Sequence, residues 1–232
     1  MWEGINMNDN DLKKICAQEA MKYIENNMII GLGGGRSIGY LIENIKENKK
    51  LKVKVVTPSV KTKMICVENG VEVLHTCLVD KVDVAFDGCD QVDENLNALK
   101  SNGGIHTKEK LIANMASQYI LLVDEGKVEK SLTFKFPVVL EILEDSLKYV
   151  ERKVSELGGK PVVRSSGIKD GFTISDNGNI LMDVTFNNVK DANKLNNELI
   201  NICGVIETSL FTDVITKVII AGEKGVRILS KN

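Results

Sequence analysis

The first half of the chain alternates between short apolar runs and longer amphipathic segments. Mostly apolar runs of the kind that form buried strands lie at residues 28–33, 51–56, 71–74, 82–86 and 119–123. Segments in which apolar residues recur about every 3.6 positions predict helices at 9–26, 40–46, 62–69 and from about 107 to 116. Strands that alternate with helices form a parallel sheet covered on both faces. We therefore predict a Rossmann-like α/β fold for this half of the chain.

The pattern changes near Leu132. Strands are predicted at 136–143, 162–164, 172–175, 180–186 and 205–211, with helices at 146–157 and 191–203. If the segment at 162–164 is counted as a frayed lead-in, the order is β-α-β-β-α-β, which is a ferredoxin-like unit. Two further apolar segments, at 214–221 and 226–229, are expected to return to the first sheet.

These patterns predict two domains in one α/β protein. A Rossmann-like parallel-sheet domain is expected over 1–132 plus 208–232, and a smaller α+β, ferredoxin-like domain is expected as an insertion over 133–207. A chain of 232 residues is long enough for two modest domains.

Composition narrows the possible partners. The net charge is −2, acids and bases are interspersed, and aromatic residues make up 5% of the chain, so a nucleic-acid surface is not expected. No apolar run reaches the roughly 18 residues needed to span a bilayer. The polar, acidic first residues do not resemble a signal peptide. We therefore expect a small-molecule partner and neither nucleic acid nor a membrane.

Cysteine and histidine usage argues against a metal centre. The five cysteines are an odd number without a C-x-x-C pair, and the chain has only two histidines. We expect reduced thiols in a cytoplasmic protein and no metal site.

A glycine-rich turn follows the first predicted strand. In G-L-G-G-G-R-S-I-G, residues 31–39, the backbone N–H groups would lie at the positive end of a helix and could bind an anion. The dinucleotide fingerprint fits poorly, because its third glycine would fall on Arg36 or Ile38 and no acid ends the second strand. A P-loop is excluded because Gly-Lys-Ser/Thr is absent. A phosphate ester is predicted here, with a plain tight turn as the alternative.

The stretch 82–113 carries most of the candidate chemistry. It opens as a strand, passes through a predicted loop with aspartates, a lysine and two glycines, and closes on a helix whose first turn contains Glu109. An ionised Glu109 can act as a general base. Asp87 and Asp90 can face one ligand, and Lys100 can neutralise an oxyanion or a phosphate. The plainer alternatives are a first-turn acid, turn-forming aspartates and a solvated lysine.

The topology predicts that these groups meet. In parallel α/β sheets, ligands bind at the carboxyl ends of the strands. Residues 33–37, 87–93 and 124–127 each follow a predicted strand, so all three segments can converge on one crevice. Lys127 is included on this ground alone, whereas Asp93 is better explained by turn formation.

At these residues the sequence resembles ribose-5-phosphate isomerase, type A. The family pattern D-G-A-D-E-[IV]-D, with K-G-G-G and E-K further on, is similar to Asp87-Gly-Cys-Asp-Gln-Val-Asp93, Lys100-Ser-Asn-Gly-Gly and Glu109-Lys110. The family's phosphate turn G-x-G-T-G-S-T is similar to Gly31-Leu-Gly-Gly-Gly-Arg-Ser37. Further matches in the same order extend the resemblance over nearly the whole chain.

The resemblance implies a reaction and a set of roles. The family interconverts ribose 5-phosphate and ribulose 5-phosphate through an enediolate, without a metal or cofactor, in the pentose phosphate pathway. Glu109 would be the base, and the sugar oxygens would be bound and polarised by Asp87, Asp90 and Lys100. The implied substrate-binding residues are Lys13, Gly34, Gly35, Arg36, Ser37, Gly88, Cys89, Ser101, Asn102, Gly103 and Lys127. A cytoplasmic homodimer or homotetramer is implied as well.

The chain departs from the family pattern in both binding segments. Gly34 and Arg36 replace a threonine and a serine, so two hydroxyl donors of the phosphate turn are lost, although Arg36 could supply bidentate charge. Ser101 and Asn102 replace two glycines where the backbone is expected to approach the ligand. The alternatives are a non-catalytic sugar-phosphate-binding paralogue, an isomerase for a different sugar phosphate, and an amino-sugar phosphate deaminase or coenzyme A transferase on a related scaffold.

Overall fold

The computed structural model describes residues 8–168 and 170–231, and the chain divides into two compact units. The first unit contains the residues up to Cys89, Lys108–Val128 and the residues from Asp213 onward. The second unit contains Asp90–Thr107 and Glu129–Thr212. The chain therefore passes from the first unit to the second within the stretch that carries most of the candidate chemistry.

The domain boundaries expected from the sequence stay a prediction. The two units differ from the expected division mainly because residues 90–107 belong to the second unit instead of the larger one. The polar first residues were the reason for not expecting a signal peptide. Residues 1–7 of that segment lie outside the described residues.

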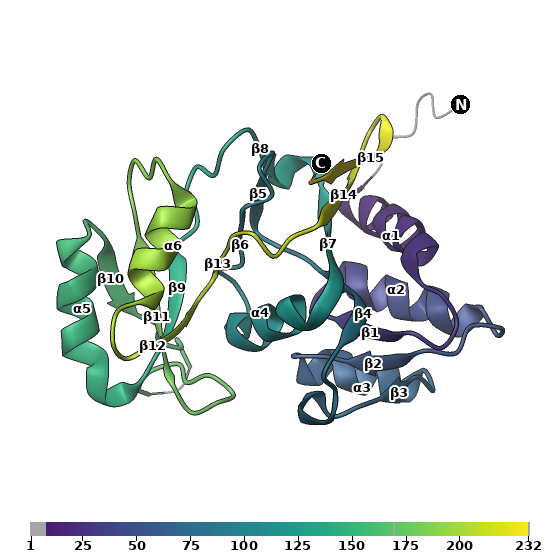
Figure 1. The fold of residues 1–232 in the computed structure, drawn as a ribbon, viewed down its shortest axis with the longest axis horizontal. Helices are drawn as coiled ribbons and strands as arrows, with labels where there is room; N and C mark the ends of the chain where they lie inside the picture. Colours follow the sequence, from purple (N-terminus) through teal and green to yellow (C-terminus); the bar gives the residue numbers. More distant parts are fainter. Residues whose placement is uncertain (1–7, 169, 232) are drawn as a thin grey trace. The chain divides into compact units, whose positions relative to one another are not determined.

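A seven-stranded sheet forms the first unit (Figure 1). Its strands are β1 (Ile29–Leu32), β2 (Lys54–Val56), β3 (Glu72–Val73), β4 (Val82–Asp87), β7 (Ala116–Asp124), β14 (Lys217–Gly222) and β15 (Gly225–Ser230). The strand order is β15-β14-β7-β4-β1-β2-β3, and every pairing is parallel except that of β14 with β15. The predicted α/β class is confirmed, and the last two apolar segments do return to this sheet.

Helices and short 3-10 turns connect these strands. They are α1 (Asp9–Ala20), η1 (Met21–Tyr23), α2 (Arg36–Glu47), α3 (Val60–Glu68), η2 (Thr76–Leu78), α4 (His106–Met115) and η3 (Glu125–Lys127). The apolar faces of α1, α2 and α3 pack with the sheet in one core that includes Leu41 and Ile42 from α2 and Phe86 and Ile120 from the strands. No helix in the described part of the chain is long and apolar enough to cross a membrane.

The beginnings of three helices differ from the predictions. The sequence offers Asp9 or Asn10 as the cap of α1, but Asn8 caps this helix, because its side chain accepts from two N–H groups of the first turn. Helix α2 begins at Arg36, four residues before the predicted Tyr40, directly after Gly35 at φ +97°. Thr107 could cap the helix predicted from about residue 107, but α4 begins at His106, so Thr107 lies inside its first turn.

The second unit contains the expected ferredoxin-like arrangement. Its elements are β9 (Val138–Ile142), η4 (Glu144–Ser146), α5 (Leu147–Glu156), β10 (Lys160–Val163), β11 (Ile180–Thr185), α6 (Ala192–Ile200) and β12 (Val205–Thr208). The antiparallel order β10-β11-β9-β12 is that of a split βαβ unit. The strand predicted at 172–175 is wrong, because two isolated bridges, through Phe172 and Ile174, form there. The segment treated as a frayed lead-in is instead the second strand of the unit, β10, which pairs with β11.

A small third sheet interrupts the predicted loop after β4. Strands β5 (Gln91–Asp93) and β6 (Ala98–Leu99) form a hairpin, joined in the sheet by β8 (Val128–Glu129) and β13 (Leu210–Phe211). Asp93 Oδ1 accepts from the N–H groups of Asn95 and Asn97, which confirms its role in the turn. The single strand predicted at 205–211 is likewise split, since β12 and β13 belong to different sheets.

Candidate active site

Three connections of the first unit leave the sheet at the same edge. Strands β7, β4 and β1 are neighbours and run parallel, so the residues that follow their carboxyl ends lie next to one another. These residues are the glycine-rich turn at 33–37, Asp87 with the two residues after it, and the η3 turn that contains Lys127.

Asp87 and Glu109 lie around one buried tyrosine in this unit. Asp87 is 3% exposed and Glu109 is 6% exposed. Tyr119 Oη donates to Asp87 Oδ2 at 3.1 Å, and the N–H of Gly88 donates to Asp87 Oδ1 at 2.8 Å. Burial raises the pKa of Tyr119 well above its ordinary value, and the negative charges of Asp87 and Glu109 raise it further. The phenol therefore stays protonated and remains a donor beside two carboxylates.

Gly33 is required by the position of Asp87. A Cβ atom added at Gly33 would lie 2.0 Å from Asp87 Oδ1. A Cβ atom added at Gly34 would have no described atom within 4 Å. We expect Gly33→Ala to lower the free energy of unfolding by about 1–3 kcal/mol through overpacking. Gly34→Ala is expected to leave it within about 0.5 kcal/mol. Urea unfolding of both variants measures this, and equal losses would contradict the assigned contact.

Two of the predicted phosphate-end cations, Lys13 and Arg36, meet the carboxylate of Asp9 at the beginning of α1. The carboxylate of Asp9 pairs with Lys13 and lies 3.5 Å from Arg36 Nη2. The hydrogen bond from Lys13 lowers the pKa of Asp9, and the charges of Arg36 and Lys127 add to this. Arg36 Nη1 also donates to Asn10 at 3.0 Å, so its guanidinium is held on α1.

Lys127 links this cationic group to the segment after β4. Its Nζ donates to the carbonyl oxygen of Cys89 at 2.9 Å. A pocket of about 290 Å³ lies between α2 and α3, and its lining includes Gly35, Arg36 and Lys61.

The second unit holds the remaining candidates on the β5–β6 hairpin. Asp90 directly precedes β5 and Lys100 directly follows β6, and the N–H of Asp90 donates to the carbonyl of Leu99 at 2.9 Å. The antiparallel pairing therefore places Asp90 beside Lys100, although ten positions separate them in the sequence. Lys100 is 5% exposed, with its Nζ 5.6 Å from the ring centre of Phe211.

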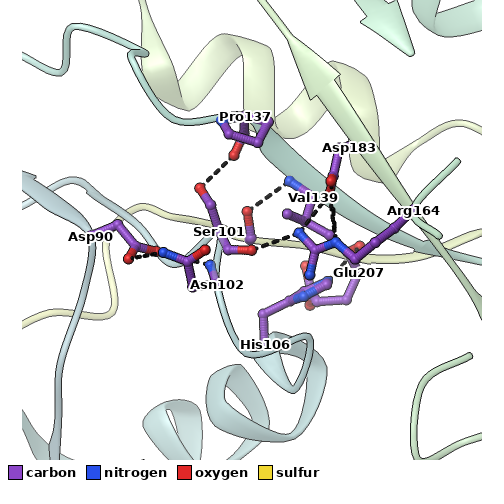
Figure 2. A network of polar contacts seen from close by, with 10 residues as sticks. Asp90, Ser101, Asn102, His106, Pro137, Val139, Arg164, Asp183 and Glu207 are labelled. Atoms are coloured by element: carbon purple, nitrogen blue, oxygen red, sulfur yellow. Dashed lines mark hydrogen bonds and ion pairs between the residues drawn. The ribbon is translucent and has the colours of Figure 1, made fainter. Parts of the chain in front are cut away.

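Both side chains that replace family glycines are bound to protein groups, as Figure 2 shows. Ser101 Oγ donates to the carbonyl oxygen of Pro137 at 2.5 Å. Asn102 donates to Asp90 from its backbone N at 2.9 Å and from its Nδ2 at 2.6 Å. Gly103 follows at φ +87°, which favours glycine.

A buried glutamate on β9 binds two other segments of the second unit, at Thr107 and at the turn 175–179. Glu141 is 1% exposed and accepts hydrogen bonds from Thr107, Ser175, Asn177 and Asn179. Burial alone would raise the pKa of this carboxyl, but the four hydrogen bonds outweigh it and lower the pKa. The carboxylate is therefore ionised at neutral pH.

Sequence reasoning missed Tyr119 and Glu141. Each is a polar residue inside an apolar strand segment, and a buried polar group requires a partner. A polar residue within an apolar strand is visible in the sequence, but the sequence does not show which residues are its partners.

The described residues contain no group of three or more His, Cys, Asp or Glu side chains placed to hold a metal ion. All five cysteines are free, and burial raises the pKa of the Cys16 and Cys66 thiols to about 11. Both thiols are therefore protonated at neutral pH and poorly nucleophilic.

Buried carboxylates at the carboxyl ends of parallel strands are typical of α/β enzymes with a small polar substrate. The family model of ribose 5-phosphate isomerase A (phosphoriboisomerase A) matches residues 54–225. Ribose-5-phosphate isomerase A of Methanocaldococcus jannaschii is 38% identical, and that of Pyrococcus abyssi is 36% identical, each over 97% of this chain and 100% of its own length. The chain therefore belongs to the ribose 5-phosphate isomerase A family of enzymes.

Solved structures agree with this assignment. The structure of ribose 5-phosphate isomerase A from Methanocaldococcus jannaschii has a TM-score of 0.90 at 37% identity. A D-ribose-5-phosphate isomerase in complex with phospho-erythronic acid has a TM-score of 0.91 at 36% identity. Each comparison covers 97% of this chain and 100% of the other.

Proposed function

We propose that this protein interconverts ribose 5-phosphate and ribulose 5-phosphate through an enediolate, as a step of the pentose phosphate pathway. The observation that carries the proposal is the pair of buried carboxylates, Asp87 and Glu109, that act on the same tyrosine in the first unit. A proton transfer next to a carbonyl requires one base and electrophilic help. Membership of the family supports the choice of this reaction.

Glu109 is the proposed base. In the aldose-to-ketose direction it removes the proton from C2 of the open-chain sugar and returns it to C1, while the hydroxyl proton on O2 moves to O1. Its position in the first turn of α4 favours the ionised form that the first step requires. Burial keeps water away from the carboxylate and strengthens its interaction with the reacting carbon.

The other candidates bind the sugar. Asp87 and Asp90 accept hydrogen bonds from hydroxyl groups, and Lys100 stabilises the negative charge that develops on the carbonyl oxygen. No step in this scheme uses a metal ion or a cofactor. Gly88, Cys89, Ser101, Asn102 and Gly103 supply the backbone around these groups.

The glycine-rich turn is the proposed phosphate site. The N–H groups of residues 34–37 lie at the beginning of α2, where the helix dipole favours an anion. Lys13, Arg36 and Lys127 add positive charge around the same turn. The guanidinium of Arg36 thus compensates for the hydroxyl groups that the turn lacks.

The purified protein is expected to convert ribose 5-phosphate to ribulose 5-phosphate without added metal, at turnover numbers ordinary for an enzyme. Absorbance of the ketose product measures this, and a panel of five- and six-carbon sugar phosphates tests the choice of substrate. Thermal stabilisation by ribose 5-phosphate without turnover would contradict the proposal and favour a non-catalytic binding protein. Faster turnover of another sugar phosphate would favour a different isomerase.

We also propose that the protein works in the cytoplasm as a homodimer or homotetramer. The reduced cysteines expected from the composition support the location. Static light scattering at several protein concentrations measures the assembly, and a mass equal to that of one 25.6 kDa chain would contradict it.

A further inference from the structure

Asn102 binds both oxygens of one candidate carboxylate. Its backbone N–H donates to Asp90 Oδ2 at 2.9 Å, and its side-chain Nδ2 donates to Asp90 Oδ1 at 2.6 Å (Figure 2). When an aspartate side chain has no hydrogen-bond partner, its χ2 angle has a broad, roughly two-fold distribution. Two donors from one residue, on different carboxylate oxygens, restrict that rotation and fix the plane of the carboxylate.

The segment that supplies these donors is itself held in place. The carbonyl oxygen of Ser101 accepts from Arg164 Nη2 at 2.8 Å, and Ser101 Oγ donates to the carbonyl oxygen of Pro137. Arg164 is anchored in turn by Asp183, to which its Nε and Nη2 both donate. Bidentate arginine–carboxylate pairs of this kind are geometrically specific. These contacts to Pro137, Arg164 and Asp183 therefore hold the backbone next to Asn102 in place before any ligand arrives.

The arrangement leaves Asp90 capable of binding a ligand. A carboxylate has about four acceptor positions, and Asn102 fills two of them. Asp90 is half-buried and Asn102 is exposed, so the pair is accessible on the second unit. A glycine in place of Asn102 would retain only the backbone donor and would let the carboxylate rotate.

We propose that Asn102 is a positioning residue, which orients the Asp90 carboxylate so that its remaining acceptor positions receive the hydroxyl groups of the sugar. The inference rests on the proposed function of Asp90. It also gives a physical reason why a side chain is present where the family pattern has glycine.

A double-mutant cycle tests the inference. Asn102→Ala is expected to lower kcat/KM for ribose 5-phosphate about tenfold in the wild-type background, as the loss of a charge-assisted hydrogen bond implies. In an Asp90→Asn background the same substitution should have less than about a twofold effect, because the group through which Asn102 acts has changed. Inhibition by inorganic phosphate should be unchanged in Asn102→Ala, since phosphate does not require Asp90.

Asn201→Ala provides the matched control. Asn201 is an exposed asparagine of the same unit, and its Nδ2 donates to the helix carbonyl of Asn197 at 2.7 Å. Wild-type kcat/KM is expected for this variant, and thermal unfolding checks that both alanine variants are folded.

The outcomes separate this inference from the proposed function. Equal effects of Asn102→Ala in both backgrounds, or wild-type kinetics of the single variant, would overturn the positioning role and leave the isomerase intact. Faster turnover in Asn102→Ala would also overturn it, because Asn102 would then obstruct the site. No turnover by the wild-type protein would overturn both.

Discussion

Glu109→Gln is expected to lower kcat for ribose 5-phosphate about a thousandfold while KM changes by less than about threefold. The amide has the shape of the carboxylate but cannot accept the proton, and general base catalysis contributes about 10²–10⁴ in rate. Asp87, Asp90 and Lys100 would still bind the substrate in this variant. We therefore expect kcat to fall while KM changes little. Steady-state kinetics on the purified variant measure both constants.

Two further variants make this test specific. Glu109→Asp keeps a carboxylate that is one methylene shorter, so its kcat should lie between those of the wild type and Glu109→Gln. Glu68→Gln changes an exposed glutamate on α3 in the same unit and should leave kcat unchanged. Turnover of Glu109→Gln within a few fold of the wild type would remove Glu109 from the role of base.

Glu141→Gln is expected to lower the free energy of unfolding by about 3 kcal/mol at neutral pH. Four side-chain donors point at this buried carboxylate, and hydrogen bonds to a charged group contribute about 1.5–3 kcal/mol each. A glutamine would place its own N–H₂ group among those donors, and only part of the network could re-form. Urea unfolding of the two proteins measures the difference.

The effect of Glu141→Gln should depend on pH with a definite sign. The hydrogen bonds hold the pKa of Glu141 in the folded protein below its ordinary value of 4.5. The carboxylate's contribution to stability is therefore fully present above that ordinary value and is lost as the pH falls through the folded-state pKa. The difference between wild type and variant should shrink over that acidic range.

Glu156→Gln is the control for this pH dependence. Glu156 also has a lowered pKa, but its partners Lys153 and Arg152 hold it on the exposed face of α5. An exposed ion pair contributes little to stability, so this variant should unfold almost like the wild type at every pH. A difference between wild type and Glu141→Gln that stays constant as the pH falls would show that Glu141 acts by packing alone.

The elements with strong periodicity could be predicted from the sequence. The parallel strands before Leu132, the alternation of strands and helices after it and the return of the last strands follow from repeating apolar positions, although the second strand of the smaller unit was assigned to the wrong segment. Such repeats record which side of a segment faces the core. The β5–β6 hairpin could not be found in this way, because strands of two or three residues are too short to show a period.

The sequence by itself determined the fold class, the family and the order of the candidate residues from Asp87 to Glu109, because each depends on local pattern or on motif spacing. Only the tertiary structure decided which groups touch. Tyr119 reaches Asp87 across neighbouring parallel strands, Asn102 reaches Asp90 across a hairpin, and Glu141 gathers donors from distant turns. The physical reason is that hydrogen bonds between residues distant in the chain depend on strand register and side-chain direction, and both are set only when the whole core packs.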